Sequence, residues 1–173
     1  MSKISVYTRE AFGGRAVNLN HDVRDLEQEG FNNAIASLKV IGEPWVAYYD
    51  KNFAGKQLMF EAGEYATLAV DRGKFSSLKM VSDDLANPEI QLFEFINYQG
   101  RTVTLRNEAN LPNILFSDKA SSHKVISGVW ILYDGINRKG DQLIAFPGDQ
   151  VPNYGPLNFD NKASSVRPLL PRP

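Results

Sequence analysis

Cysteine is absent from this chain of 173 residues. Without thiols there is no disulfide framework, no zinc–thiolate site and no cysteine nucleophile, which fits a reducing compartment. Histidine is scarce too: His21 and His123 lie far apart and neither has a ligand spacing, so we expect each at the surface or in a turn. Because no activated nucleophile or acid–base pair stands out, the sequence predicts a protein that is not an enzyme.

An excess of charge of either sign is also missing, with 19 Lys and Arg against 20 Asp and Glu. No basic cluster is present, so we expect no nucleic-acid partner. No apolar run is long enough to span a bilayer, and residues 1–7 lead directly into strand-like alternation without an apolar signal stretch. These features predict no membrane span and a cytoplasmic location; an extracellular one stays open for a chain whose signal has been removed.

Aromatic residues and glycine, by contrast, recur in a fixed pattern. Its skeleton is an aromatic, four residues, a second aromatic, one residue and then glycine. It occurs three times in full, and once with Arg138 replacing the second aromatic: Tyr7–Gly14, Tyr48–Gly55, Phe93–Gly100 and Tyr133–Gly140. Two strands joined by a short turn explain it, because glycine reaches φ > 0 without strain. Four copies at a near-constant step indicate an internal repeat.

Two further markers define the organisation of the repeats. Each hairpin is followed at a similar distance by a serine-containing segment: Ser37–Val40, Ser76–Lys79, Ser121–Lys124 and Ser164–Arg167. Tryptophan appears at twice the repeat, as Trp45 and Trp130, so the units alternate in type and the chain is a duplicated pair. We therefore predict two domains, residues 1–84 and 85–168, and a proline-rich tail, residues 169–173.

Short strands, glycine turns and the lack of long helical periodicity predict an all-β fold. Units of four strands suggest Greek keys, two of them packed per domain as a β-sandwich. A β-trefoil has a repeat of similar length, but it needs three units rather than four alternating ones. The last unit is expected to end at Val166, because residues 167–173 are too rich in proline for a strand interior. They predict an extended tail, or a linker to further sequence.

These markers resemble the βγ-crystallin superfamily. The hairpins beginning at Tyr7, Tyr48 and Phe93 match its Greek-key signature, and the two tryptophans open the second key of each pair. Within the superfamily the chain most resembles the amphibian epidermis-differentiation-specific type, through the segments Pro44–Tyr48, Ser121–Val125 and Val151–Tyr154. Some relatives of this type carry a pore-forming, aerolysin-like domain after the crystallin pair.

The resemblance implies calcium sites in the second domain. Many members bind Ca²⁺ through a loop of the type Asn/Asp-Asn/Asp-x-x-Ser/Thr-Ser, which residues 160–165 match at every position and residues 117–122 match except at Ser117. Calcium takes six to eight oxygen ligands, which such loops supply from side chains and carbonyls. The first loop is expected to use Asp160, Asn161, Lys162 and Ser164 with a backbone oxygen of Glu94; the second is expected to use Asp118, Lys119 and Ser121 with Asp134.

The corresponding loops of the first domain depart from this pattern. Residues 32–37 have Ala36 where a hydroxyl is needed, and residues 72–77 begin with Arg72 and Gly73 where ligands belong. We therefore predict weak or no binding there. Serine, asparagine and aspartate also close turns by bonding to neighbouring backbone groups, and this alternative stays open for all four loops.

The sequence thus predicts a non-enzymatic, calcium-binding βγ-crystallin-type protein with a structural, stress-related or epidermal-differentiation role, in which Ca²⁺ braces the second domain. One alternative is a targeting or regulatory module of a membrane-active, pore-forming assembly. Another is a structural crystallin that is indifferent to calcium. Expected partners are calcium and, beyond it, a second copy of the chain or a pore-forming partner or domain.

Overall fold

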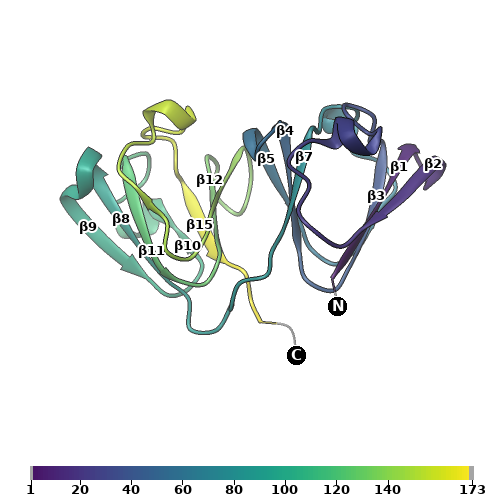
Figure 1. Ribbon diagram of the computed structural model, residues 1–173. Coiled ribbons are helices and arrows are strands. Elements are labelled where there is room, and N and C mark those ends of the chain that lie inside the picture. Colours follow the sequence, from purple (N-terminus) through teal and green to yellow (C-terminus); the bar gives the residue numbers. More distant parts are fainter. Residues whose placement is uncertain (1, 172–173) are drawn as a thin grey trace. The chain divides into compact units, whose positions relative to one another are not determined.

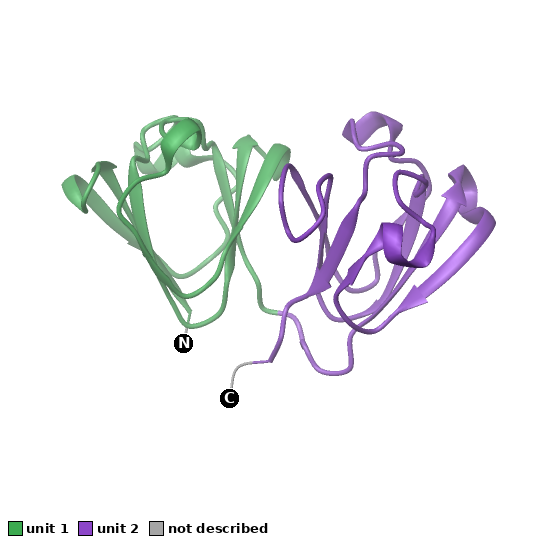
Figure 2. Cartoon of the chain, turned by 180° about the vertical axis from the view of Figure 1, so that it is seen from behind, with its two compact units in different colours: residues 1–82 green, residues 83–173 purple. Residues whose placement is uncertain are grey.

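The computed structural model describes residues 2–171. The chain divides into two compact units, residues 1–82 (unit 1) and residues 83–173 (unit 2), coloured separately in Figure 2. Their regular structure consists of β-strands and short 3₁₀-helices, so the predicted all-β class is confirmed. Within residues 2–171 no helix combines the length and the hydrophobicity needed to cross a membrane.

Unit 1 (Figure 1) contains two Greek keys, and each of them contributes residues to the sheet of the other. Its elements are β1 (Lys3–Arg9), β2 (Gly13–Leu19), η1 (Leu26–Glu29), β3 (Ser37–Ile41), β4 (Trp45–Asp50), β5 (Ala54–Phe60), β6 (Gly63–Tyr65), η2 (Ala69–Asp71) and β7 (Ser77–Met80). One sheet has the order β2-β1-β3-β6, and β5-β4-β7 pair in the other. Strand β6 belongs to the second key in sequence but pairs with β3 of the first. In return, Val23 of the first key forms a bridge with Leu78 on β7 of the second.

Unit 2 repeats this exchange. Its elements are β8 (Glu89–Phe95), η3 (Ile96–Tyr98), β9 (Gln99–Leu105), β10 (Ala109–Asn110), η4 (Leu111–Ile114), β11 (Ser122–Ser127), β12 (Trp130–Tyr133), β13 (Gln142–Ala145), β14 (Gln150–Val151), η5 (Gly155–Leu157) and β15 (Ser165–Pro168). The strand orders are β14-β11-β8-β9 and β10-β15-β12-β13. The short β10 of the third key pairs with β15 of the fourth, and β14 of the fourth pairs with β11 of the third. The sequence predicted only a loop and a glycine turn at these third strands, because two or three residues carry no readable alternation.

The four aromatic-glycine hairpins share one backbone conformation. In each, two consecutive non-glycine residues have φ between 54° and 64°, and a glycine with φ of 75–88° follows two positions later. The first and second aromatic rings then meet, with centroids 5.6 Å apart for Tyr7–Phe12 and 5.4 Å for Phe93–Tyr98. The sequence predicted the positive φ at glycine, but the two preceding left-handed residues appear only in the structure.

A serine from the end of each key closes the corresponding hairpin. Ser37 Oγ donates to the Arg9 carbonyl at 2.6 Å, and it accepts the Phe12 amide at 3.0 Å. The second serine of each other repeat does the same, with Ser77, Ser122 and Ser165 donating to carbonyls of their own hairpins at 2.6–2.7 Å. The serine and the aromatic skeleton recur together because they form one hydrogen-bonded corner. For these four serines the turn-closing role is therefore the correct one.

Each unit has its own hydrophobic core. Trp45 and Phe75 are completely buried in unit 1, and Trp130 and Phe116 in unit 2. The predicted end of the last unit at Val166 was wrong: β15 continues through Pro168, and the Leu169 amide donates to the Val129 carbonyl at 2.9 Å. Pro168 is tolerated because it lies past Ser165 and Val166, the residues that pair with β10, so that β15 is an edge strand at this position.

Candidate functional site

The two loops singled out in unit 2 lie against each other at one end of the unit. The Asp118 amide donates to the Ala163 carbonyl at 2.9 Å, and the Asn161 amide donates to the Ala120 carbonyl at 3.2 Å. Both Asp118 and Asn161 have a left-handed backbone, with φ of 54° and 55°. These residue types tolerate that conformation, and it directs each side chain toward the opposite loop.

The first cluster combines Ser121 from one loop with Asn161 from the other. Ser121 Oγ donates to Asn161 Oδ1 at 3.2 Å. The Ser121 amide donates to the Phe93 carbonyl at 2.9 Å, which places this cluster beside the next residue, Glu94. We call Ser121, Asn161 and Glu94 site A.

The second cluster has the same arrangement with the two loops interchanged. Ser164 Oγ donates to Asp118 Oδ1 at 2.9 Å and lies 3.5 Å from the Lys162 carbonyl. The Ser164 amide donates to the Tyr133 carbonyl at 2.8 Å, so Asp134 is the adjacent residue. Asp134 Oδ1 also accepts the Asp141 amide, which holds the carboxylate in its hairpin. We call Ser164, Asp118 and Asp134 site B.

In this crossed arrangement each serine bonds to the other loop, whereas the predicted ligand sets were grouped by loop; which oxygens share an ion stays a prediction. The sequence grouped Ser164 with Asn161 and Glu94, and Ser121 with Asp118 and Asp134, because neighbours in one loop were assumed to serve one ion. The exchanged strands explain the difference. Each loop starts beside the sheet of the other key and ends in the sheet of its own, so its second residue and its fifth belong to different clusters.

Three predicted ligands lie outside both clusters as far as their side chains are concerned: Asp160, Lys119 and Lys162. All three are exposed, and no contact described for them joins their side chains to either cluster. The ammonium groups of the two lysines are donors only, so a lysine can offer a cation nothing but its backbone carbonyl.

The oxygens gathered in sites A and B suit calcium better than a transition metal. Each cluster contains a hydroxyl and a carboxylate or amide oxygen, beside a hairpin whose carbonyls are close, and hard oxygen donors are the ligands that Ca²⁺ takes. Among residues 2–171 no group of three or more His, Cys, Asp or Glu side chains gathers in a way that could hold a metal ion. Hydroxyl, amide and carbonyl donors would therefore have to supply most of the coordination, which predicts modest affinity.

Unit 1 preserves one of the two clusters. Ser76 Oγ donates to Asn33 Oδ1 at 3.3 Å, and the Ser76 amide donates to the Tyr48 carbonyl, as in site B. At the position of site A the structure places Ala36 and Gly73, which have no side-chain oxygen. The Gly73 amide donates to the Ile35 carbonyl, which corresponds to the Asn161–Ala120 hydrogen bond of unit 2. The backbone contact between the loops is thus retained, although the side-chain oxygens of site A are missing. Neither loop of unit 1 matches the motif alone, yet together they form one serine–asparagine pair.

A buried polar pair lies directly beneath site A. His123 Nδ1 is 2.6 Å from Tyr154 Oη, and the Tyr154 amide donates to the Ser121 carbonyl. Nε2 of His123 is buried and has no hydrogen-bond partner in the described chain. Burial lowers the pKa of His123 to about 4 and raises the pKa of Tyr154 well above its ordinary value.

The expectation that His123 lies at the surface or in a turn was wrong. His123 is 1% exposed and sits on β11, opposite Leu92 and Val151. The repeat contained the signal, because Ser122-His123 corresponds to Ser37-Leu38, and Leu38 is a core residue of unit 1.

Comparisons with known proteins identify the family of the chain. Residues 3–81 and 89–169 match the model of the Beta/Gamma crystallin family, and the chain belongs to that family. It is 38% identical, over 98% of its length and 50% of the relative's, to the Epidermal differentiation-specific protein of Cynops pyrrhogaster. It is 30% identical to human Beta-crystallin B1 over 85% of its length and 61% of the relative's. The predicted superfamily and its epidermal-differentiation type are thereby confirmed.

The chain is also similar to solved structures. A beta gamma crystallin from Ciona intestinalis matches 45% of this chain and 98% of its own, with 28% identity and a TM-score of 0.44. Protein S complexed with calcium matches 98% of this chain and 100% of its own, with 26% identity and a TM-score of 0.42. The chain spans about half the length of the Cynops relative.

Proposed function

We propose that this chain is a non-enzymatic, calcium-binding βγ-crystallin protein of the structural or epidermal-differentiation kind, in which Ca²⁺ braces the loops of unit 2. The observation that carries the proposal is the crossed pairing of Ser121 with Asn161 and of Ser164 with Asp118, 3.2 and 2.9 Å apart. An ion bound at either cluster joins two loops that are far apart in sequence. Binding to the folded state alone raises stability by mass action, by about 1.4 kcal/mol per site at tenfold excess over the Kd.

Calcium acts on both keys of unit 2 because each site takes oxygens from both loops. In site B, the hydroxyl of Ser164 and the carboxylate of Asp118 now bond to each other, and a cation would take both oxygens as ligands. The negative charge of Asp118 and the nearby Asp134 favours that exchange. Site A has an amide in place of this carboxylate, so we assign it the weaker affinity.

The test is a calorimetric calcium titration of the metal-stripped protein, combined with melting in calcium and in chelator. Asn161→Ala and Ser121→Ala should each remove site A, and the double variant should lose no more binding than either alone. Asp118→Ala and Ser164→Ala should behave in the same way for site B. Thr104→Ala, at an exposed position on β9, is the matched control.

Two results would overturn the proposal. If the protein shows no heat of binding and no calcium-dependent rise in Tm, the chain is a structural crystallin indifferent to calcium. If Ser121→Ala instead eliminates the same site as Asp118→Ala, each loop binds its own ion and the crossed assignment is wrong.

A targeting or regulatory role in a membrane-active, pore-forming assembly is a second candidate. It is supported only by the length comparison, since about half of the Cynops relative lies outside the match. Membrane permeabilisation by a longer natural form, absent for residues 1–173 alone, would favour it.

A further inference from the structure

One end of unit 2 gathers the turns of both hairpins and the two crossed loops; we call it the loop end of unit 2. The Asn97 amide in the β8–β9 hairpin donates to Pro152 at 2.8 Å, and the Asn137 amide in the β12–β13 hairpin donates to Asn110 Oδ1 at 2.9 Å. The guanidinium of Arg101 donates to the Leu115 carbonyl. Figure 1 shows the turn between β8 and β9 and the yellow-green η5 at the same end of this unit.

Large apolar side chains are exposed at this loop end, each on a different turn or loop except for one adjacent pair. They are Phe95 (55% exposed), Ile96 (45%), Leu115 (73%), Ile136 (48%) and Leu157 (47%). Scattered exposed apolar residues are ordinary, but several at one end of one unit are the kind of surface that marks an interaction site.

Unit 1 has a smaller apolar surface: among its described residues, the large apolar side chain exposed at the loop end is Val70 on η2. The equivalent positions in unit 1 follow from three matches. The hairpin registers correspond, the contact of Arg15 with Gly30 matches that of Arg101 with Leu115, and η2 and η5 end at corresponding residues. In unit 1 these are Arg9, Glu10, Gly30, Lys51 and Asp71. At these five positions unit 1 thus carries polar or glycine residues and unit 2 carries apolar residues, so the fold itself does not require the apolar side chains.

Leu115 shows the contrast most clearly. It ends η4 in the left-handed conformation with φ of 58°, where unit 1 has Gly30 with φ of 73°. Glycine is the residue that helix ends favour in this conformation, and a non-glycine residue there is strained. A leucine that is both strained and 73% exposed contributes little to folding.

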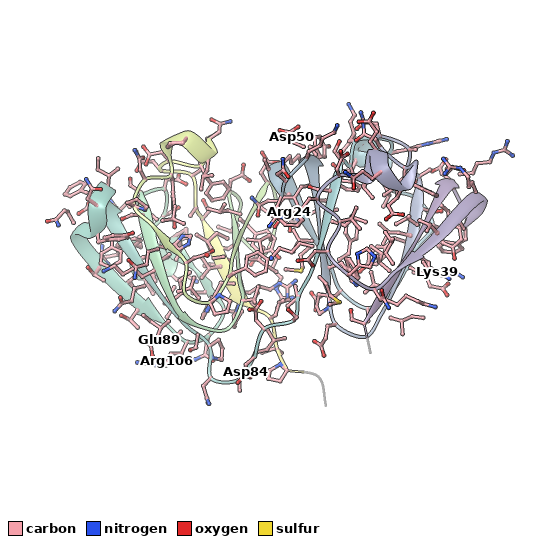
Figure 3. The ribbon with its side chains drawn as sticks, viewed as in Figure 1. Arg24, Lys39, Asp50, Asp84, Glu89 and Arg106 are labelled. Carbon is pink, nitrogen blue, oxygen red and sulfur yellow. The ribbon has the colours of Figure 1, made fainter. Side chains whose placement is uncertain are left out.

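The charges between the apolar side chains point to an anionic surface. Lys119 and Lys162 are exposed, one in each crossed loop, and no ion pair is recorded for either in the described chain. Other basic residues of unit 2 are paired: Arg138 with Glu108 at the loop end, and Arg106 with Glu89 at the opposite end, at 3.1 Å (Figure 3). Two bound calcium ions would offset the four carboxylates of Glu94, Asp118, Asp134 and the exposed Asp160, so that the lysines set the sign of the charge; this part rests on the proposed function.

We propose that the loop end of unit 2 docks on an anionic lipid surface, with the apolar side chains inserted among the acyl chains and Lys119 and Lys162 at the headgroups. Apolar groups on separate loops with lysines between them fit a fluid bilayer, since a soft interface accepts several separate insertions. Shallow insertion of apolar groups together with electrostatic attraction is the established route to peripheral membrane binding.

The test is flotation of the whole chain with vesicles of equimolar phosphatidylcholine and phosphatidylserine, in calcium and in chelator, against vesicles of phosphatidylcholine alone. The variant Phe95→Ser, Ile96→Ser, Leu115→Gly should lower partitioning by about a hundredfold. The matched control is Ile41→Ser, Val70→Ser, Ile126→Ser, which removes three apolar residues exposed elsewhere and should leave partitioning unchanged. A Phe95→Trp variant should show quenching of the added indole by brominated acyl chains.

Several outcomes would overturn the docking proposal: no flotation with anionic vesicles, equal loss in both triple variants, or no quenching by brominated lipid. Calcium calorimetry on the same proteins separates the two proposals. Heat of calcium binding without flotation contradicts lipid docking alone. Flotation without any heat of calcium binding contradicts the calcium function and leaves lipid docking supported.

Discussion

The two units have the same strand exchange and the same hairpin corners, but they differ at positions that the fold leaves free. Unit 1 has an apolar pair, Leu38 and Leu68, where unit 2 has the hydrogen-bonded pair of His123 and Tyr154. Unit 1 also retains one oxygen cluster and exposes one large apolar side chain at its loop end, Val70, whereas unit 2 has two clusters and exposes five such side chains. Duplication thus left one copy close to a plain scaffold and gave the other the features that point to ligands.

The largest expected difference between the units is their response to acid. His123 has a lowered pKa when folded, about 4 against 6.5, so below pH 6.5 the unfolded chain binds a proton that the folded unit does not. The stability of unit 2 should therefore fall as pH drops from 6.5 to about 4, by about 3 kcal/mol in total. Hydrogen exchange of β11 amides across this range, compared with β3 amides, measures it.

The matched variant copies unit 1. His123→Leu with Tyr154→Leu removes the buried histidine without leaving an orphaned hydroxyl, and it should abolish the excess acid sensitivity of unit 2. The explanation fails if this variant and the natural chain lose the same stability between pH 6.5 and pH 4.

A second prediction converts unit 1 into a two-site unit. Ala36→Ser with Gly73→Asn restores the side chains of site A, and asparagine tolerates the left-handed backbone of position 73, where φ is 71°. We expect one additional calcium equivalent by calorimetry and about 1.4 kcal/mol of extra stabilisation at tenfold excess over the Kd. Ala36→Ser alone is the control, and an unchanged stoichiometry in the double variant would show that site A needs more than these two side chains.

A third prediction concerns the two helix ends. Leu115→Gly should leave unit 2 as stable or stabilise it by up to about 1 kcal/mol, because relief of left-handed strain opposes the greater chain entropy of glycine. Gly30→Leu in unit 1 should destabilise by about 1 kcal/mol or more, since a Cβ there meets Arg15 Nη1 at 3.1 Å. Urea unfolding of both variants checks the opposite signs, and two losses of equal size would remove the argument that Leu115 is strained.

The smallest expected effect is at the hairpin that lacks its second aromatic. Arg138 makes a two-pronged contact with Glu108, with Nε–Oε2 of 2.5 Å and Nη2–Oε1 of 2.8 Å. The hydrogen bond from Arg138 lowers the pKa of Glu108. Because the pair is exposed, Glu108→Gln should cost only about 0.5 kcal/mol in denaturant unfolding. A loss of several kcal/mol would show that this ion pair replaces the missing aromatic contact in full.

Much of the architecture followed from the sequence because its signals are local. The spacing of Tyr48, Phe53 and Gly55 reports a hairpin, and four such hairpins with alternating tryptophans report two pairs of Greek keys. Strand β1 was predicted from alternation within a few residues. Strands β10 and β14 escaped prediction because two residues carry no period, and they are defined by partners between 26 and 57 residues away in sequence.

The candidate site, too, has features that depend on local sequence and features that depend on contacts between distant segments. The chain itself determined the repeat, the fold class and the residues able to offer oxygen to a cation, since each depends on residue type at short spacing. Only the tertiary structure decided that Ser121 meets Asn161, that Ser164 meets Asp118, and that His123 is buried against Tyr154. Those contacts exist because each key lends a strand to the other sheet, and pairing between distant segments is set by the packing of the whole unit.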